Sequence, residues 1–396
     1  KPITAQYLVT NADYIACHFQ EYVKRFDMLD SIREGGAFVL NSRWTVEDME
    51  KEIPADFRRK LVQKKVKFYN VDARKICDSF GLGKRINMLM QACFFKLSGV
   101  LPLAEAQRLL NESIVHEYGK KGGKVVEMNQ AVVNAVFAGD LPQEVHVPAS
   151  WANAVDTDTR KPTGVEFVDK IMRPLMDFKG DNLPVSVMTP GGIFPVGTTQ
   201  YAKRAIAAFI PKWIPANCTQ CNYCSYVCPH ATIRPFVATD QELQQAPESF
   251  VTRKAKGDYQ GMNFRIQVAP EDCTGCQVCV ETCPDDALEM TDSFTATPLQ
   301  RANWEFAIKL PNRGAMTDRN TLKGSQFQQP LLEFSGACEG CGETPYVKLL
   351  TQLFGERTVI ANATGCSSIW GGTAGLAPYT TNAKGQCPAW GNSLFE

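Results

Sequence analysis

Eight of the fifteen cysteines fall into two copies of one spacing pattern. Each copy has three cysteines at every third position, then a fourth after three further residues, and ends in proline. The first copy runs from Cys218 to Pro229, and the second from Cys273 to Pro284. Closely spaced cysteines that end in Cys-Pro are typical ligands of paired [4Fe–4S] clusters. The pattern therefore predicts the chemistry of one-electron transfer.

In such a pair of runs the fourth cysteine binds the cluster of the other run. This rule predicts two ligand sets, which are Cys218, Cys221, Cys224 and Cys283 for one cluster and Cys273, Cys276, Cys279 and Cys228 for the other. Both runs also have an aliphatic residue five positions after the last cysteine, Ile233 or Leu288. This repetition predicts the internal two-fold relation of a ferredoxin-like domain.

Zinc and disulfide bonds are the alternative uses of so many cysteines. Zinc sites use pairs of cysteines in two CxxC knuckles, without a third cysteine at the next step. Disulfide frameworks are typical of small secreted domains, whereas this chain has 396 residues.

The segment between the runs, residues 234–272, is longer than a minimal two-cluster domain needs, and residues 263–269 have the pattern of an extra strand.

Composition limits the remaining functional classes. The chain has 42 basic and 42 acidic residues, without the basic excess that is typical of nucleic-acid binding. No apolar run reaches the ~18 residues that a membrane helix needs. The longest candidate, residues 88–103, is interrupted by Lys96, Gly99 and Pro102. We therefore expect neither a nucleic-acid partner nor a membrane span, and the free cysteines favour a reducing compartment.

The predicted fold class is a multidomain combination of α/β and α+β. Residues 1–150 are expected to form a doubly wound α/β domain, because short apolar strands alternate with helical patterns. The strands are expected at residues 7–9, 37–40 and 66–71, and the helices at 19–29, 87–97 and 103–118. A glycine turn at 81–87 is either a phosphate site at a helix start or an ordinary turn.

Three further segments follow. Residues 151–195 are rich in proline and are expected to be an irregular linker or small domain. Residues 196–312 contain the ferredoxin-like domain. Residues 313–396 are expected to start another α/β domain, with strands at 331–334 and 358–361 around a helix at 346–354. Since the chain begins at Lys1 and breaks off at Glu396, we expect an internal part of a longer polypeptide.

A third group of cysteines consists of Cys338, Cys341 and Cys366. Alone, the CxxC pair is compatible with a redox dithiol, half of a zinc site or buried free thiols. Loops of small residues surround the group, at 342–345 and 365–372, where the backbone could approach a diphosphate.

Taken together, these motifs resemble a known enzyme family. The runs 195–204, 335–346, 362–372 and 388–396, with the double cysteine motif among them, are similar in content and order to pyruvate:ferredoxin (or flavodoxin) oxidoreductase of the single-chain, homodimeric type. The resemblance covers essentially the whole chain.

The resemblance implies particular roles for individual residues. Cys338, Cys341 and Cys366 would bind a third [4Fe–4S] cluster, whose fourth ligand would lie beyond Glu396, and Cys387 would be a bystander. Glu343 and Cys366 would border thiamine diphosphate, whose magnesium site also lies outside this chain. In the first domain, Asn87 and Asn129 would contact coenzyme A.

The activity implied is oxidative decarboxylation of pyruvate with coenzyme A to acetyl-CoA and carbon dioxide. Electrons would pass through three [4Fe–4S] clusters to ferredoxin or flavodoxin, and the cofactors would include thiamine diphosphate and Mg²⁺. The resemblance also implies a homodimer, either cytoplasmic or in a mitochondrion-related organelle of a protist. The alternatives are another 2-oxoacid oxidoreductase, an NADP-linked fusion, and a non-catalytic electron-transfer module of a larger complex.

Overall fold

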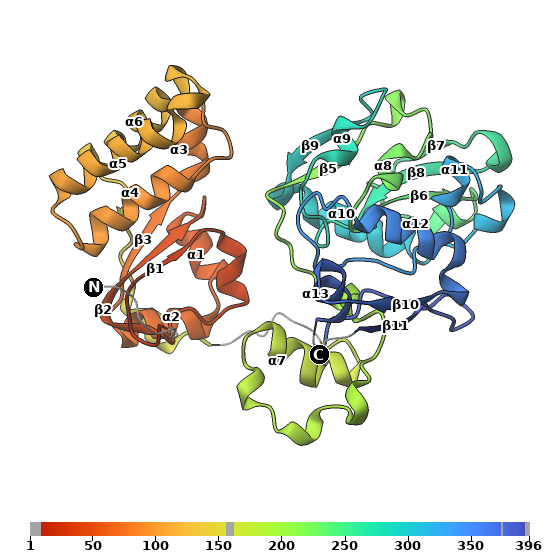
Figure 1. The fold of residues 1–396 in the computed structure, drawn as a ribbon, viewed down its shortest axis with the longest axis horizontal. Helices are drawn as coiled ribbons and strands as arrows, with labels where there is room; N and C mark the ends of the chain where they lie inside the picture. The colour runs from red at the N-terminus through yellow and green to blue at the C-terminus, as the bar shows by residue number, and fades with distance from the viewer. Residues whose placement is uncertain (1–8, 156–161, 374, 393–396) are drawn as a thin grey trace. The chain divides into compact units, whose positions relative to one another are not determined.

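The computed structural model describes residues 9–155, 162–373 and 375–392. The chain divides into two compact units, Lys1–Lys161 and Pro162–Glu396 (Figure 1). The division lies close to the predicted end of the first domain. The finer boundaries within the second unit stay predictions.

The first unit is built from a four-stranded sheet and surrounding helices. The strands lie in the order β1-β2-β3-β4, where the first three are parallel and β4 is antiparallel to β3. The strands are β1 (Ala12–Cys17), β2 (Ile32–Asn41), β3 (Lys67–Val71) and β4 (Gln143–Glu144). The helices are α1 (Val46–Glu52), α2 (Ala55–Gln63), α3 (Ala73–Ser79), α4 (Asn87–Ser98), α5 (Leu103–Tyr118) and α6 (Gly123–Ala138).

Both faces of this sheet are buried. Successive side chains of a strand point to opposite faces. On β2, Phe38 and Leu40 therefore pack into a core with residues of α1 and α2, such as Phe57. Val39, between them, packs into a second core with residues of α3 to α6. Helices α4, α5 and α6 lie side by side (Figure 1). The predicted mixed α/β character is confirmed.

One predicted helix of this unit is wrong. Residues 19–29 form only a short 3₁₀ helix at Gln20–Lys24, followed by turns. Two lysines of the α2 region hold the turns at the end of this segment and just after it. Lys60 forms ion pairs with Asp27 and Asp30, and Lys64 donates to the carbonyls of residues 29, 30 and 32. Of the expected strand at 7–9, residues 7 and 8 lie outside the described residues.

The second unit contains three small sheets. Strand β5 pairs with β9, and β8 lies between β6 and β7, all antiparallel, whereas β10 and β11 are parallel. The strands are β5 (Phe209–Trp213), β6 (Ile233–Ala238), β7 (Arg253–Lys254), β8 (Asn263–Val268), β9 (Leu288–Asp292), β10 (Val359–Asn362) and β11 (Ala389–Asn392). The helices are α7 (Arg173–Met176), α8 (Tyr223–Tyr226), α9 (Val278–Glu281), α10 (Ser293–Ala307), α11 (Leu322–Ser325), α12 (Thr344–Phe354) and α13 (Cys366–Gly372).

The internal repeat is visible in the order of these elements. Each cysteine run contains a one-turn helix, α8 or α9, and is followed by a strand that starts at Ile233 or Leu288. The long segment between the runs supplies β7 and β8, which confirms the extra strand predicted there. In the last part of the chain, the predicted helix is α12 and the second predicted strand is β10. The strand predicted at 331–334 is wrong, because only the isolated bridge Leu332–Tyr379 forms there.

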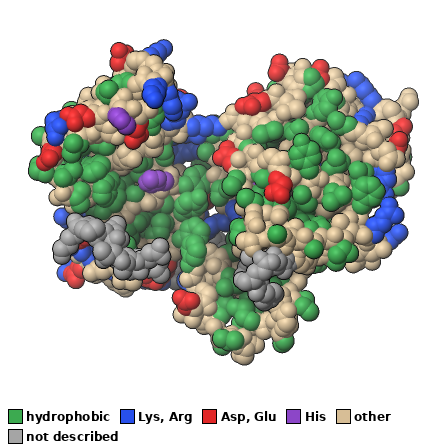
Figure 2. Space-filling view, in the orientation of Figure 1, with side chains coloured by type: hydrophobic (Ala, Val, Ile, Leu, Met, Phe, Trp, Pro, Cys, Tyr) green, Lys and Arg blue, Asp and Glu red, His purple; other side chains and the backbone are tan. Residues whose placement is uncertain are grey.

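The surface carries both signs of charge. Acidic and basic side chains occur together on the visible face of each unit, with hydrophobic side chains between them (Figure 2). Among the described residues, no helix has both the length and the apolarity that crossing a bilayer requires.

Candidate metal centres

The two cysteine runs line two cavities of the second unit. The first cavity is bordered by Cys218, Cys221, Cys224 and Cys283, together with Trp213 and Ile266. The second is bordered by Cys228, Cys273, Cys276 and Cys279, together with His230 and Met290. The two cavities are similar in size. Each therefore collects three cysteines from one run and the fourth from the other run, the grouping that the sequence predicts for the ligands.

Repeated backbone geometry turns the cysteines inward. Six residues within or just after the two runs have a positive φ, at three equivalent positions in each half, and five of them are not glycine. These pairs are Gln220 and Gly275, Asn222 and Gln277, and Ala231 and Asp286. Left-handed backbone is unfavourable for residues with a Cβ, so the surrounding structure must hold these turns. The turn at Gln220 is held by its side-chain amide, which donates a hydrogen bond to the Lys254 carbonyl and accepts one from the Lys256 N–H.

Backbone amides already point at several of the thiols. Thr232 N–H donates to Cys228 Sγ at 3.4 Å, and at the equivalent position Ala287 N–H donates to Cys283 Sγ at 3.2 Å. Gly275 N–H donates to Cys273 Sγ at 3.4 Å. Hydrogen bonds to sulfur stabilise the thiolate form and influence the reduction potential of a bound cluster. The donor set therefore fits [4Fe–4S] ligation.

The thiols differ in how easily they ionise. Burial raises the pKa of Cys273 to about 12 and also raises the pKa values of Cys224 and Cys279. Burial also acts to raise the pKa of Cys228. The Lys348 ammonium and several hydrogen bonds, one of them from Thr232, act in the opposite direction and outweigh burial, so the Cys228 pKa is lowered. Since iron binds the thiolate, metal binding at the buried cysteines must release protons.

Among the residues that the structure describes, no three His, Cys, Asp or Glu side chains converge closely enough to hold a single metal ion. The cysteines instead stand around the rims of the two cavities. A multi-atom cluster bonds its ligands at separate corners, so the observed arrangement suits a cluster.

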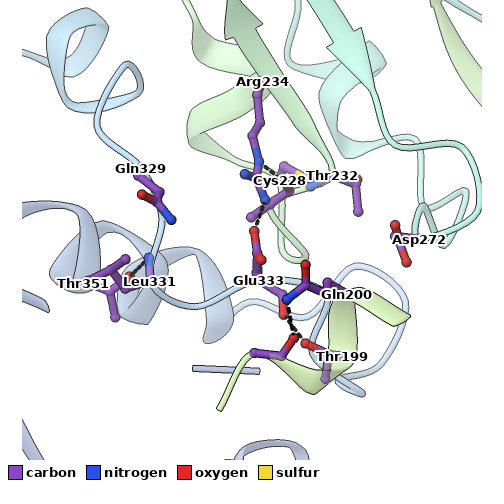
Figure 3. Close-up of polar contacts among 12 residues, drawn as sticks. Thr199, Gln200, Cys228, Thr232, Arg234, Asp272, Gln329, Leu331, Glu333 and Thr351 are labelled. Carbon is purple, nitrogen blue, oxygen red and sulfur yellow. Dashed lines mark hydrogen bonds and ion pairs between the residues drawn. The ribbon is translucent and has the colours of Figure 1, made fainter. Parts of the chain in front are cut away.

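A network of polar contacts joins the cysteine domain to the segments before and after it. Arg234 of β6 forms an ion pair with Glu333, whose backbone carbonyl accepts a hydrogen bond from Thr199 Oγ1 at 2.9 Å (Figure 3). The Arg234 guanidinium also lies over the rings of Trp304 and Phe334. These contacts connect three segments that are far apart in the sequence.

Comparison with known proteins identifies the family. Residues 1–139 match the family described as pyruvate ferredoxin/flavodoxin oxidoreductase, and residues 217–287 match the 4Fe-4S dicluster domain. The first third of the chain thus carries a domain of the pyruvate ferredoxin/flavodoxin oxidoreductase family. Residues 154–207 match a further domain, named EKR, of unknown function.

Relatives from several organisms match this chain over its whole length. It is 93% identical to a Euglena gracilis protein named pyruvate dehydrogenase (NADP⁺), mitochondrial, and spans 22% of that protein. It is 54% identical to the pyruvate:ferredoxin oxidoreductase of Moorella thermoacetica, and 44% identical to the pyruvate-flavodoxin oxidoreductase of Enterobacter agglomerans. It spans 34% of each of these two proteins.

The third cysteine group lies at the surface of the second unit. Cys338 and Cys366 are exposed and Cys341 is partly buried. The 338–341 turn packs against the second cavity, since a Cβ added at Gly340 would lie 3.8 Å from Cys276 Cβ. His230 strengthens this connection, because its Nδ1 lies 3.1 Å from the Ser335 carbonyl oxygen.

Glu343 and Cys366 occupy the starts of two helices. Glu343 immediately precedes α12, and Cys366 is the first residue of α13. A hydrogen bond links the helices, because Trp370 of α13 donates from Nε1 to Glu343 Oε2 at 3.4 Å. Burial raises the pKa of Tyr379, which packs against Trp370, and the Glu343 charge adds to this effect.

Asn87 and Asn129, in the first unit, have different surroundings. Asn87 starts α4, is exposed, and donates from its amide to Tyr118 Oη at 3.1 Å. Asn129 is only 3% exposed, and its amide donates to the Val125 carbonyl of its own helix at 2.7 Å. The exposed amide of Asn87 is thus the more accessible of the two.

Lys348 is a residue of the site that sequence reasoning missed. It lies on α12, yet its ammonium reaches the backbone around Cys228, and burial lowers its pKa to about 8, although the Cys228 thiolate acts in the opposite direction. A lysine within a helical pattern normally indicates an exposed position. The contact between Lys348 and the backbone around Cys228 therefore could not be predicted from the sequence.

Proposed function

We propose that the chain carries the electron relay of an enzyme that converts pyruvate and coenzyme A to acetyl-CoA and carbon dioxide. The observation that carries this proposal is the grouping of eight cysteines around two cavities, each with three cysteines of one run and one of the other. We assign one [4Fe–4S] cluster to each cavity. The match of residues 1–139 to the oxidoreductase family supports pyruvate as the substrate.

The third cluster belongs, in this proposal, to Cys338, Cys341 and Cys366. Contact between the 338–341 turn and Cys276 supports electron flow from the third cluster to the second cavity and then to the first. The family's domain arrangement, with an α/β domain, the ferredoxin-like domain and the start of a thiamine diphosphate domain, is part of the same proposal. A fourth ligand of the third cluster and the Mg²⁺ site would come from elsewhere in the full-length protein.

Thiamine diphosphate, when bound, supplies the chemistry of decarboxylation. The chain's own residues would border and orient it. Glu343 is held by Trp370, so its carboxylate has a fixed direction, and the glycines at 371 and 372 allow close packing against Trp390. For coenzyme A, the exposed amide of Asn87 suits a direct contact, whereas the buried Asn129 suits the support of α6.

The final electron acceptor has two candidates. Ferredoxin or flavodoxin follows from the bacterial relatives, whose names include these carriers. NADP⁺ is favoured by the names of the Euglena gracilis relative and of a Cryptosporidium parvum relative that is 48% identical. The Euglena protein is also named mitochondrial, which favours the organelle over the cytoplasm for this chain. We also propose that the full-length protein is a homodimer.

Anaerobic EPR spectroscopy of the full-length protein tests the proposed reaction. Pyruvate should produce a radical with partial reduction of the clusters, and coenzyme A should bring the reduction to completion. Reduction by dithionite without reduction by pyruvate would contradict pyruvate as the substrate, and 2-oxoglutarate would be the next compound to test. Adding NADP⁺, ferredoxin or flavodoxin to the reduced protein would then identify the acceptor by reoxidation of the clusters.

A further inference from the structure

The two cavities share a buried positive charge. Lys348 is 2% exposed, although the neighbouring Tyr346 is 74% exposed on the same helix α12. Its Nζ donates to the carbonyls of Ser225, of Tyr226 at 3.0 Å and of Cys228 at 3.3 Å. The ammonium therefore caps the C-terminal end of α8, between a cysteine of the first cavity, Cys224, and one of the second, Cys228.

Carbonyl groups satisfy the hydrogen bonds of this ammonium but do not neutralise its charge. Within the described part of the chain, no salt bridge joins Lys348 to a carboxylate, and the neighbours that favour its charged form are Cys228 and Cys224. The nearby Arg234 is also positive. An uncompensated buried charge is strongly unfavourable. Negative charge in the adjacent cavities would compensate it.

A [4Fe–4S] cluster with four thiolate ligands provides this negative charge, and each reduction adds one more unit. A fixed cation nearby therefore stabilises the reduced state more than the oxidised state. Coulomb energies fall with distance and are stronger in a dry interior than in water. The net charge around a cluster is one of the factors that set its reduction potential.

We propose that Lys348 is a positioning residue that raises the reduction potentials of the clusters on either side of α8. It acts through charge and does not ligate iron. The proposal rests on the cluster assignment made above. It also gives α12, which starts beside Glu343, an electrostatic influence on the relay.

The test is an EPR-monitored redox titration of the full-length protein with Lys348→Gln, which keeps an amide donor for the carbonyls and removes the charge. We expect the equilibrium constant for reduction of at least one of the two clusters to fall about tenfold, which is about 59 mV for a one-electron couple. Lys348→Arg should stay near the wild-type potentials. Lys309→Met, a change at an exposed lysine of the same unit, is the matched control and should have no effect.

Iron and sulfide analysis separates the possible outcomes. Clusters absent from the wild-type protein would contradict the proposed function itself. Fully loaded Lys348→Gln protein with unchanged potentials would overturn only the role of Lys348. If Lys348→Gln does not load clusters but Lys348→Arg does, the requirement follows charge and supports the proposal. If neither variant loads clusters, the requirement is for the shape of lysine, and the proposal fails.

Discussion

At the scale of single residues, the fourth cysteine of each run determines how the two halves are connected. Cys283 belongs to the second run but borders the first cavity, and Cys228 does the reverse. The sequence predicts this exchange because the spacing before Cys-Pro is diagnostic. Lys348 could not be predicted in the same way, since its burial depends on packing between segments more than one hundred residues apart.

The exchange predicts the behaviour of serine variants. Cys283→Ser should change the same EPR signal as Cys221→Ser, because both residues border the first cavity. Cys228→Ser should instead match Cys276→Ser. A Cys283→Ser spectrum that matches Cys276→Ser would show that each run binds its own cluster and would contradict the exchange.

The third cysteine group gives a second prediction. Cys341→Ala should leave the clusters of both cavities intact, so dithionite should still reduce them. Pyruvate should no longer reduce them, because the proposed connection to the thiamine diphosphate site is lost. Cys387→Ala, at a partly buried cysteine assigned no ligand role, is the control and should behave as wild type. Normal turnover of Cys341→Ala would exclude the proposed third cluster.

At the scale of elements, the sequence predicted some long helices but not others, since α6 and α10 were not expected. Helices α4, α5 and α12 lie where their periodicity places them. The helix expected at 19–29 is absent, and tertiary contacts hold the end of this segment in turns, where Lys60 pairs with Asp27 and Lys64 donates to the Leu29 carbonyl. Periodicity also does not reveal which face of α12 is buried. Its buried residues are polar, such as Lys348 and Gln352, whereas Tyr346 and Leu350 are exposed.

The contact between α13 and β11 is tight enough to predict a substitution effect. A Cβ at Gly372 would lie 2.2 Å from Trp390 Cη2, so Gly372→Ala must displace either the Trp390 ring or α13. We expect α13 to move, and Cys366 with it. Overpacking of this kind costs about 1–3 kcal/mol. We expect faster hydrogen exchange in residues 366–372 and loss of iron equivalent to one cluster.

Gly391→Ala is the matched control on the adjacent strand. An added Cβ there would meet no atom within 4 Å, so exchange and iron content should stay unchanged. Equal effects of the two alanine variants would show that Trp390 packing does not position α13.

At the scale of the whole molecule, the chain combines two compact units and spans 22% to 34% of the lengths of the relatives described above. Its cysteine pattern was sufficient to predict the relay, because the ligands of both cavities lie within the chain. The thiamine diphosphate site could be predicted only by resemblance, which assigns Glu343 and Cys366 to one side of the proposed site.

The crosswise arrangement of cysteines also has a consequence for assembly. A cluster that forms in one cavity fixes the tail of the other run, and this tail contributes to the second cavity. Filling one cavity therefore lowers the entropy cost of filling the other, and the two should load cooperatively. Native mass spectrometry under limiting iron should detect molecules with both clusters or neither, with few half-loaded forms. A statistical mixture would instead mean that the two halves mature independently.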